Sequence, residues 1–485
     1  MTVYDVSIID LVVQTARSNE ARVPKGMRAF SFGQRSIGSL TEGEDVMKPS
    51  VLYSAAAAAM MTAMPSMALA ADEAAPELSA GDIAYMCVAT LLVLIMTPAL
   101  GFFYGGLVRR KNALNTIMMS MSCLAIFTVQ WYVYGYSLSF GPDVGGIIGN
   151  LDWAFFDKVG LEADADYSAT IPHVLFAMFQ LAFAILTPAI VSGGIVERTR
   201  FPAYCLFVLL WGTLVYDPMC HMVWAVGGFI RDMGALDFAG GTVIHITSGF
   251  SALTAAILIG RRQGYGAIAL RPHNMPYVLL GGSFLWLGWF GFNSGAALGA
   301  TALTSIALAN TGIASCTAGL VWIILDKVIH NKMTCLGIMT GFVAGLVGIT
   351  PAAGFVTTGG AFFIGLTTPF ICYFFISVVK PKLGYDDSLD AFGCHGVGGV
   401  WGALMTGVFC TKAVNDAGAD GLLYGNPAQM IPQITGIVVG IVMAVVMTTI
   451  IIKVLGLFME VRATESEEAQ GLDLIDHGER AYNKL

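Results

Sequence analysis

DAFGCHGVGG, residues 390–399, places an aspartate and a histidine in a glycine-rich run whose other residues are typical of a membrane helix. A second stretch, DFAGGTVIHI at 237–246, has the same character. Small residues let helix backbones approach closely in lipid, where no hydrophobic effect drives helices together. An ionisable side chain inside the hydrocarbon layer is costly and indicates a function by default. The two stretches therefore predict closely packed helices around two functional histidines, His245 and His395.

The composition identifies lipid as the main solvent of the chain. Of 485 residues, 56% are hydrophobic and 12% are charged, and the mean hydropathy is +0.71. These values predict an all-α polytopic membrane protein. The net charge of -8 gives no basic surface for nucleic acid. The nine cysteines include no Cys-x-x-Cys pair, so neither a disulfide framework nor a zinc site is indicated, and we expect no metal and no cofactor.

The amino-terminal region has the form of a secretory signal peptide behind an extra segment. From Met47, a lysine, a short apolar run and a final Ala-Leu-Ala precede acidic residues, which predicts a signal peptide at 47–70, cleaved after Ala70. Residues 1–46 then represent either a misassigned start, with initiation at Met47, or an extension of unknown role. The alternative for 47–70 is an unprocessed membrane segment, but its run is short for a span of about 20 residues.

Eleven apolar segments follow, and several are long enough to cross a membrane. They lie at roughly 80–107, 113–138, 171–196, 201–223, 241–260, 275–297, 303–326, 334–352, 359–379, 391–410 and 430–458. Alternate loops carry twelve Lys and Arg, against three on the opposite side. The positive-inside rule therefore predicts a mature amino end outside the cell and a cytoplasmic carboxyl end. We expect a membrane domain at 71–459 and a polar cytoplasmic tail at 460–485.

The two histidines occupy matching places of a predicted inverted repeat. His245 lies in the fifth segment and His395 in the tenth, and each follows an aspartate, Asp237 or Asp390, at the start of its segment. Two halves of five segments in opposite orientation, plus one extra helix, would bring these positions together near the membrane centre. Asp237 would then lie at the outer mouth, and Asp390 would be a structural carboxylate at the cytoplasmic side.

Besides an interhelical hydrogen bond, such a pair could be a haem ligand set, a proton relay or the lining of a pore. Two bis-histidine haems would require four histidines well inside helices. The other histidines fall at segment ends, in loops or in the tail (His173, His221, His273, His330 and His477). The sequence therefore favours the pore.

Aromatic residues lie near the outer ends of segments, in FAMFQLAFA (176–184), VYDPMCHMVW (215–224) and GWFGFNSGAA (288–297). One interpretation is an interfacial aromatic belt. Aromatic faces also attract small cations, by about 0.5–2 kcal/mol. Together with the histidines, they indicate passage of a small cation that is stripped of water, or of a proton, on its way in.

Motifs run along nearly all of the mature chain: GFFYGGLVRRKN (101–112), ERTRF (197–201), HMVW (221–224), DFAGGTVIHI (237–246), GWFGFNSG (288–295), GLVGITPAAGFV (345–356), DAFGCHGVGG (390–399) and EEAQGLDLIDHGERAY (467–482). On these motifs the chain resembles the Amt/Rh ammonium transporter family, on its Amt side. The resemblance implies a homotrimer in the inner (plasma) membrane that takes up ammonium as a nitrogen source. It also implies one narrow pore in each protomer and no enzymatic activity.

The resemblance assigns roles at the outer end of this pore to residues that match the family's motifs. Trp224 and Phe179 would form a vestibule that recruits ammonium by cation–π contact, with Tyr216 nearby. Phe183 and Phe292 would stack beneath it as a gate. Ammonium would lose its proton near this gate.

Deeper in the pore, the resemblance implies that His245 and His395 line a hydrophobic lumen as a hydrogen-bonded pair and conduct ammonia, with proton co-translocation. Asp237 would hold the vestibule backbone and favour access of the cation. One residue departs from the pattern, because Ala296 stands where many Amt members have a serine. Recruitment would then rest on Trp224, backbone carbonyls, and Ser294 or water. We expect outer binding that is weaker by about 1 kcal/mol, or differently placed.

Two other functions stay open from the sequence. The tail resembles the family's ordered tail, which couples protomers and contributes to docking of a PII-type signalling protein. The chain could therefore be an ammonium sensor that acts through such a partner, since it contains no fused kinase, cyclase or other signalling domain. An Rh-like channel for neutral gas is disfavoured by Trp224 and by the DFAGGTVIHI motif.

Overall fold

The computed structural model describes residues 77–482, so the predictions for 1–46 and for the signal peptide at 47–70 lie outside the described residues. The α-helices are α3 (Ala80–Leu94), α4 (Met96–Leu107), α5 (Ala113–Gln130), α6 (Tyr136–Phe140), α7 (His173–Ile195), α8 (Phe201–Trp211), α9 (Asp217–Trp224), α10 (Phe229–Asp232), α11 (Thr247–Ile259), α12 (Met275–Gly295), α13 (Ala302–His330), α14 (Cys335–Ile349), α15 (Thr358–Phe374), α16 (Lys380–Leu383), α17 (Val397–Phe409), α18 (Met430–Phe458), α19 (Glu465–Gln470) and α20 (Leu472–His477). Five π-helical turns extend them: η2 (Trp131–Gly135), η4 (Gly212–Tyr216), η5 (Gly241–Ile246), η6 (Phe375–Val379) and η7 (Phe392–Gly396).

Short elements occupy the connections. The 3-10 turns are η1 (Arg110–Asn112), η3 (Ala154–Phe156), η8 (Leu422–Tyr424) and η9 (Pro427–Gln429). Strands β1 (Asp143–Val144) and β2 (Ile148–Gly149) pair antiparallel as a small hairpin. The described chain is therefore helical apart from this hairpin and the loops, as the composition predicts.

Nine helices of the described chain are long and apolar enough to cross a membrane, and each coincides with one of the predicted apolar segments. The other two segments, 334–352 and 391–410, are helical as well. The first contains α14, which has 15 residues, and the second contains η7 followed by α17. The chain is a multi-pass membrane protein, and the count of eleven crossings stays a prediction.

Glycines bring the two histidine-bearing segments into backbone contact. A Cβ atom on Gly249 of α11 would lie 2.1 Å from the backbone nitrogen of Gly396 in η7. A Cβ atom on Gly399 of α17 would lie 3.0 Å from the Cβ atom of His245. Any larger residue at Gly249 would push the backbones apart, so the glycine content of these stretches serves close packing, as predicted.

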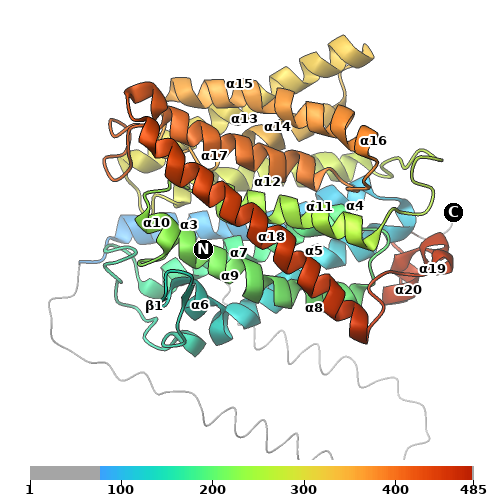
Figure 1. Ribbon diagram of the computed structural model, residues 1–485, viewed down its shortest axis with the longest axis horizontal. Helices are drawn as coiled ribbons and strands as arrows, with labels where there is room; N and C mark the ends of the chain where they lie inside the picture. Colours follow the sequence, from blue (N-terminus) through green and yellow to red (C-terminus); the bar gives the residue numbers. More distant parts are fainter. Residues whose placement is uncertain (1–76, 483–485) are drawn as a thin grey trace, which may run out of the picture. The chain divides into compact units, whose positions relative to one another are not determined.

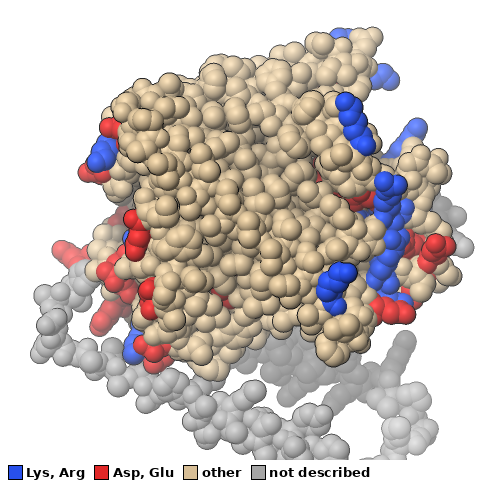
Figure 2. Space-filling view, in the orientation of Figure 1, with Lys and Arg blue, Asp and Glu red and all other residues tan. Residues whose placement is uncertain are grey.

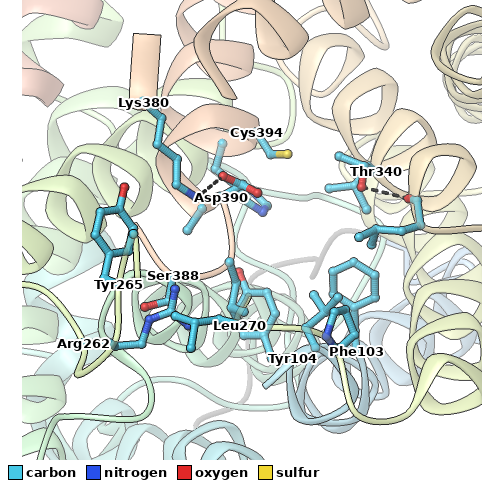
Figure 3. A pocket seen from close by; sticks show the side chains of 18 of the residues that line it. Phe103, Tyr104, Arg262, Tyr265, Leu270, Thr340, Lys380, Ser388, Asp390 and Cys394 are labelled. Carbon is cyan, nitrogen blue, oxygen red and sulfur yellow. Dashed lines mark hydrogen bonds and ion pairs between the residues drawn. The ribbon is translucent and has the colours of Figure 1, made fainter. Parts of the chain in front are cut away.

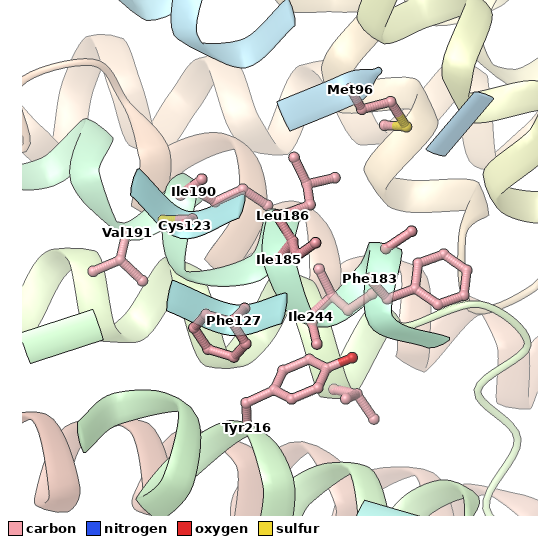
Figure 4. Packing of buried hydrophobic residues seen from close by; sticks show 14 of the residues in the cluster. Met96, Cys123, Phe127, Phe183, Ile185, Leu186, Ile190, Val191, Tyr216 and Ile244 are labelled. Atoms are coloured by element: carbon pink, nitrogen blue, oxygen red, sulfur yellow. The ribbon is translucent and has the colours of Figure 1, made fainter. Parts of the chain in front are cut away.

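Helix α7 lies at the centre of the bundle and packs against α3, α5 and α11. Figure 4 shows Phe183 and neighbouring residues of α7 among other buried side chains, including Phe127 and Tyr216. By contrast, α18 runs across the outside of the bundle in Figure 1 and exposes apolar side chains such as Val438 and Leu457. An apolar exposed face of this kind is typical of a helix that contacts lipid.

Charged side chains gather at the two ends of the bundle and leave an uncharged band between them (Figure 2). Lys and Arg are concentrated at the end where α16, α19 and α20 lie. We call it the Lys380 end, after the first residue of α16, and the opposite one the Trp224 end.

The tail is ordered and docks on the Lys380 end. Arg462 donates to the backbone oxygens of Ile259 and Arg261, at 2.9 and 2.7 Å, and forms an ion pair of 2.6 Å with buried Glu468. Further along, the backbone nitrogen of Asn115 donates to Asp473 at 2.8 Å. Helices α19 and α20 are therefore fixed to the loops between the membrane helices.

Candidate functional site

The side chains of His245 and His395 meet inside the bundle. Their Nδ1 atoms are 3.1 Å apart, and their ring centroids are 5.2 Å apart. A neutral imidazole carries one N–H, so one ring donates from Nδ1 and the other accepts at Nδ1. The two neutral rings are therefore opposite tautomers, and together they present one accepting Nε2 and one donating Nε2–H.

Each histidine lies in a π-helical turn, His245 in η5 and His395 in η7. A π turn contains one residue more than an α turn and is frequent at functional sites. The side chains are almost fully buried, with exposed fractions of 0% and 5%. The Nε2 atom of His245 has no hydrogen-bond partner among the described residues. The Nε2 atom at the His245 end of the pair can therefore still form a hydrogen bond.

The carboxylate of Asp237 caps the turn η5. Its two oxygens accept hydrogen bonds from four successive backbone N–H groups, those of residues 240 to 243, at 2.6–3.2 Å. Burial raises the pKa of this carboxyl above its ordinary value, although the four N–H groups act in the opposite direction. The backbone oxygen of Asp237 also accepts a 2.8 Å hydrogen bond from Nε1 of Trp224. Asp237 thus links the predicted vestibule residue to the histidine turn.

The equivalent residue in the second half is Asp387, not Asp390 as the sequence interpretation had it. Asp387 accepts hydrogen bonds from the backbone nitrogens of Ala391 and Phe392, at 3.2 and 2.8 Å, and so caps η7. Asp390 instead forms an ion pair with Lys380, at 2.6 Å. The physical reason is spacing, because the capping residue must stand at a fixed distance before the π-helical turn that carries the histidine. Asp387 precedes His395 by the same number of residues as Asp237 precedes His245, whereas Asp390 is too close.

Aromatic rings lead away from His245. Its ring stacks on Trp289, with centroids 5.3 Å apart, and on Phe292, at 6.2 Å. Phe292 meets Phe183 edge-to-face at 4.4 Å, and Phe183 meets Phe179 in the same manner at 4.7 Å. The predicted gate pair is thus in contact and adjoins the histidines.

A cavity of about 170 Å³ lies beyond Phe183 at the Trp224 end. We call it the Trp224 cavity; its lining includes Tyr167, Phe176, Gln180, Phe183, Trp224, Arg231 and Ala296. Trp224 and Phe183 therefore face it as expected, and so does Ala296, where the hydroxyl is missing. Phe179 and Tyr216 are buried and are not among its lining residues.

Different contacts explain these two positions. Phe179 lies against Gly295 of α12, where an added Cβ would be 2.6 Å from its ring. The ring of Tyr216 packs edge-to-face on Phe127, with centroids 6.4 Å apart (Figure 4). The structure thus places both residues in the packed interior of the bundle.

A second cavity, of about 370 Å³, lies at the Lys380 end and reaches His395. We call it the Lys380 cavity. Figure 3 shows the Lys380–Asp390 ion pair on one side of it, next to Cys394, and the rings of Phe103 and Tyr104 on another. The histidine pair therefore lies between this cavity and the aromatic residues that lead to the Trp224 cavity.

Buried ion pairs support the wall of the Lys380 cavity. Glu197, which is 0% exposed, pairs with Arg109 and with Arg262, both at 2.7 Å, and Arg262 pairs with Asp386 at 2.7 Å. Burial alone would raise the pKa of Glu197, but the guanidinium groups of Arg262 and Arg109 outweigh it and hold the pKa below its ordinary value. Because Arg262 also lines the cavity, this network fixes the loops around it.

Several residues near the site were not identified from the sequence. These are Gln180, Lys380 and Trp289. Gln180 gave only the signal of a polar residue inside an apolar segment, and Lys380 was counted only among the basic residues of the loops. Within residues 77–482 no group of three or more His, Cys, Asp or Glu is placed to hold a metal ion.

Comparison with known proteins gives consistent matches. A sequence profile described as the Ammonium Transporter Family matches residues 84–482. The chain is 49% identical over 402 residues to an ammonium transporter of Bacillus subtilis, covering 83% of this chain and 98% of that protein. It is 46% identical to an ammonium transporter of Aquifex aeolicus, over 84% of this chain and 94% of the relative.

Solved structures agree with the sequence matches. The crystal structure of Saccharomyces cerevisiae Mep2 is similar with a TM-score of 0.76 and 34% identity, over 81% of this chain and 89% of that one. A structure named Sensor Amt Protein is similar with a TM-score of 0.75 and 27% identity, over 82% of this chain and 98% of that one. The likeness thus covers the helix bundle described above.

Proposed function

The chain belongs to the Ammonium Transporter Family, and from this premise we propose that it conducts ammonium nitrogen from the Trp224 end to the Lys380 end, through a path lined by His245 and His395. The observation that carries the proposal is the contact between the two imidazole rings, at 3.1 Å, between two cavities at opposite ends of the bundle. The concentration of Lys and Arg at the Lys380 end supports a cytoplasmic location for that end.

Recruitment takes place in the Trp224 cavity. The faces of Trp224 and neighbouring aromatic rings attract a small cation. Asp237 holds the backbone between this cavity and η5 through four hydrogen bonds, so the position of Trp224 is coupled to that of His245. An aromatic surface concentrates ammonium without binding it so tightly that passage stops.

Deprotonation follows from desolvation. Phe183 and Phe292 lie between the Trp224 cavity and His245 in edge-to-face contact, with ring centroids 4.4 Å apart, and a bare ion in such a low-dielectric region loses its hydration without replacement. Near this pair the ion therefore transfers its proton to the accepting Nε2 of the histidine pair, and neutral ammonia goes on. Potassium has no proton to lose and is rejected.

The histidine pair then provides a path for neutral ammonia and for the proton. Low-dielectric surroundings disfavour a charged imidazole, and the opposite tautomers of the pair offer an accepting nitrogen and a donating N–H along the path. A proton that passes along the shared Nδ1–Nδ1 hydrogen bond makes net transport electrogenic. Ammonia recovers a proton on reaching the Lys380 cavity, which opens beside His395.

The test is ammonium-evoked current in proteoliposomes that contain the full chain. His245→Ala and His395→Ala should each reduce the transient current at least about tenfold, while His330→Ala, an exposed histidine paired with Tyr373, should not. Full current in both pore variants would refute the proposed path. Equal currents with potassium and ammonium would refute the deprotonation step.

A second candidate function is ammonium sensing through a PII-type partner. Two observations favour it: the similarity to the structure named Sensor Amt Protein, and the ordered tail held by Glu468 and Asp473 at the Lys380 end. We retain the homotrimer implied by the family in both cases. Ammonium-dependent capture of a PII-type protein, without current in proteoliposomes, would favour the sensor over the transporter.

A further inference from the structure

A third cavity, of about 560 Å³, lies where α11 and α18 end and the tail begins. We call it the Gly456 cavity. Its apolar lining, which includes Leu258 and Ile452, comes mainly from the last two turns of the helices. Its polar lining comes from the tail and consists of Glu460, Arg462 and Thr464. The cavity therefore has an apolar floor between two membrane helices and a polar rim beyond their ends.

The cavity opens among side chains that face lipid. Three large apolar residues next to its lining residues in the sequence are strongly exposed, with fractions of 60% for Ile257, 78% for Leu457 and 82% for Phe458. Exposed apolar patches of this kind mark a contact with a membrane or a partner. Water finds no polar partners on an apolar floor. A hydrocarbon chain is therefore the group that fills this space.

Two charges at the cavity are not fully compensated within the chain. Lys453 is exposed on α18, three positions before the glycine that names the cavity, and forms no hydrogen bond or ion pair with a described residue. Glu460 on the rim is 68% exposed and shares its partner Arg200 with Glu467. By contrast, Arg462 is saturated by a buried carboxylate and two backbone oxygens. A positive charge thus precedes a negative one along the path out of the membrane.

This order of charges matches one class of phospholipid headgroup. In phosphatidylethanolamine the phosphate lies on the membrane side of a primary ammonium group. A lysine on a membrane helix extends its ammonium group toward the headgroups, so Lys453 can reach the phosphate. A primary ammonium donates charge-assisted hydrogen bonds to a carboxylate such as Glu460. Phosphatidylcholine has no N–H on its quaternary nitrogen, and phosphatidylglycerol has no amine.

We propose that a phosphatidylethanolamine molecule occupies the Gly456 cavity, with an acyl chain between α11 and α18, its phosphate at Lys453 and its ammonium group at Glu460. The lipid belongs to the leaflet at the Lys380 end and joins the ends of two membrane helices to the first residues of the tail. Figure 1 shows how this end of α18 leads into the tail. The inference is independent of what the chain transports.

The experiment measures hydrogen exchange of the backbone amides in 459–464, for the full chain in phosphatidylcholine nanodiscs with increasing fractions of phosphatidylethanolamine. The backbone nitrogens of Val461 and Arg462 donate to no other described residue, so their exchange reports on a lipid that covers them. Protection should rise with the fraction of phosphatidylethanolamine and then saturate. Phosphatidylglycerol at the same fractions should not have this effect.

Three variants remove parts of the site. Gly456→Phe fills the cavity without displacing the chain, because a Cβ atom at this glycine meets nothing within 4 Å. Its exchange in 459–464 should no longer depend on phosphatidylethanolamine. Lys453→Gln and Glu460→Gln each remove one partner of the headgroup, so each should need about fivefold more phosphatidylethanolamine for half of the protection.

Matched controls separate lipid binding from general effects of the same substitutions. Gly359→Phe adds a ring at an exposed glycine whose Cβ atom would lie 3.8 Å from the nearest atom, outside the cavity. Lys382→Gln and Glu465→Gln each remove one exposed charge at the Lys380 end. All three should keep the dependence on phosphatidylethanolamine that the parent shows.

Several outcomes would overturn the proposal. Protection that still depends on phosphatidylethanolamine in Gly456→Phe would place the lipid elsewhere. Equal effects of phosphatidylglycerol, or unchanged lipid dependence in both charge variants, would contradict the headgroup. Exchange in the parent that no lipid alters, together with a smaller assembly of Gly456→Phe, would assign the cavity to a second copy of the chain.

Discussion

Asp237 and Asp387 have the same relationship to the two histidines: each lies eight residues before one of them and caps the π-helical turn that carries it. The two caps precede the fifth and the tenth predicted segments, the last of each predicted half, which are the positions that the predicted inverted repeat makes equivalent. They differ in extent, since Asp237 accepts four backbone hydrogen bonds and Asp387 two.

Replacement of Asp237 should affect both stability and transport. In Asp237→Asn the amide group offers one oxygen, so at least two of the four N–H groups lose their acceptor, at a cost of about 2 kcal/mol or more. Because Trp224 donates to the backbone oxygen of the same residue, current should fall as well. The thermal unfolding temperature in detergent and the current in proteoliposomes check this. Asp232→Asn, an exposed carboxylate at the same end, should match the parent in both.

Restoring the hydroxyl at position 296 should strengthen outer binding. Ala296 lines the Trp224 cavity, so a serine there would face the same space as Gln180. One net hydrogen bond of about 1 kcal/mol corresponds to a half-saturating ammonium concentration about fivefold lower in Ala296→Ser. A half-saturation equal to that of the parent would contradict the idea that the missing hydroxyl weakens recruitment.

The sequence was sufficient for the helices and for the histidine pair, because both depend on strong local signals. Runs of apolar residues locate helices in lipid, and an ionisable residue within such a run is conspicuous. The family and the multi-pass membrane architecture that it predicted are confirmed by the comparisons.

The sequence interpretation was wrong where a residue's place depends on which face of a helix it occupies or on its exact distance from another residue. Phe179 and Phe183 belong to one motif, but only Phe183 is on the face of α7 toward the Trp224 cavity. Asp390 looked equivalent to Asp237 because it starts the apolar run, although the cap position is Asp387. Gln180, which lines the Trp224 cavity, gave no sequence signal beyond being polar.

The buried carboxylate of Glu197 should stabilise the Lys380 end in a pH-dependent manner. Its pKa is lowered in the folded protein below the ordinary 4.5, so its contribution is present above about pH 4.5 and is lost as the pH falls through the folded-state pKa. Glu197→Gln removes the negative charge between Arg109 and Arg262 and should cost about 3 kcal/mol at neutral pH. Unfolding temperatures of parent and variant should therefore converge in acid.

The exposed Glu479 provides the control for this pH dependence, since Glu479→Gln should leave the unfolding temperature unchanged at every pH. A difference between the parent and Glu197→Gln that stays constant from pH 7 to below pH 4 would contradict a charge-based contribution of Glu197.

Arg462 should be required to hold the tail on the Lys380 end. Its guanidinium group joins the end of α11, through the oxygen of Ile259, to the buried carboxylate of Glu468. Arg462→Ala removes both contacts and leaves Glu468 without its cationic partner, so local opening of α19 and α20 should become at least about tenfold more frequent. Hydrogen exchange of the backbone amides in 465–477 measures this, with Arg480→Ala, an exposed tail residue, as the control. Because the membrane helices keep their own packing, faster exchange confined to the tail is expected, and unchanged exchange there would show that other contacts hold it.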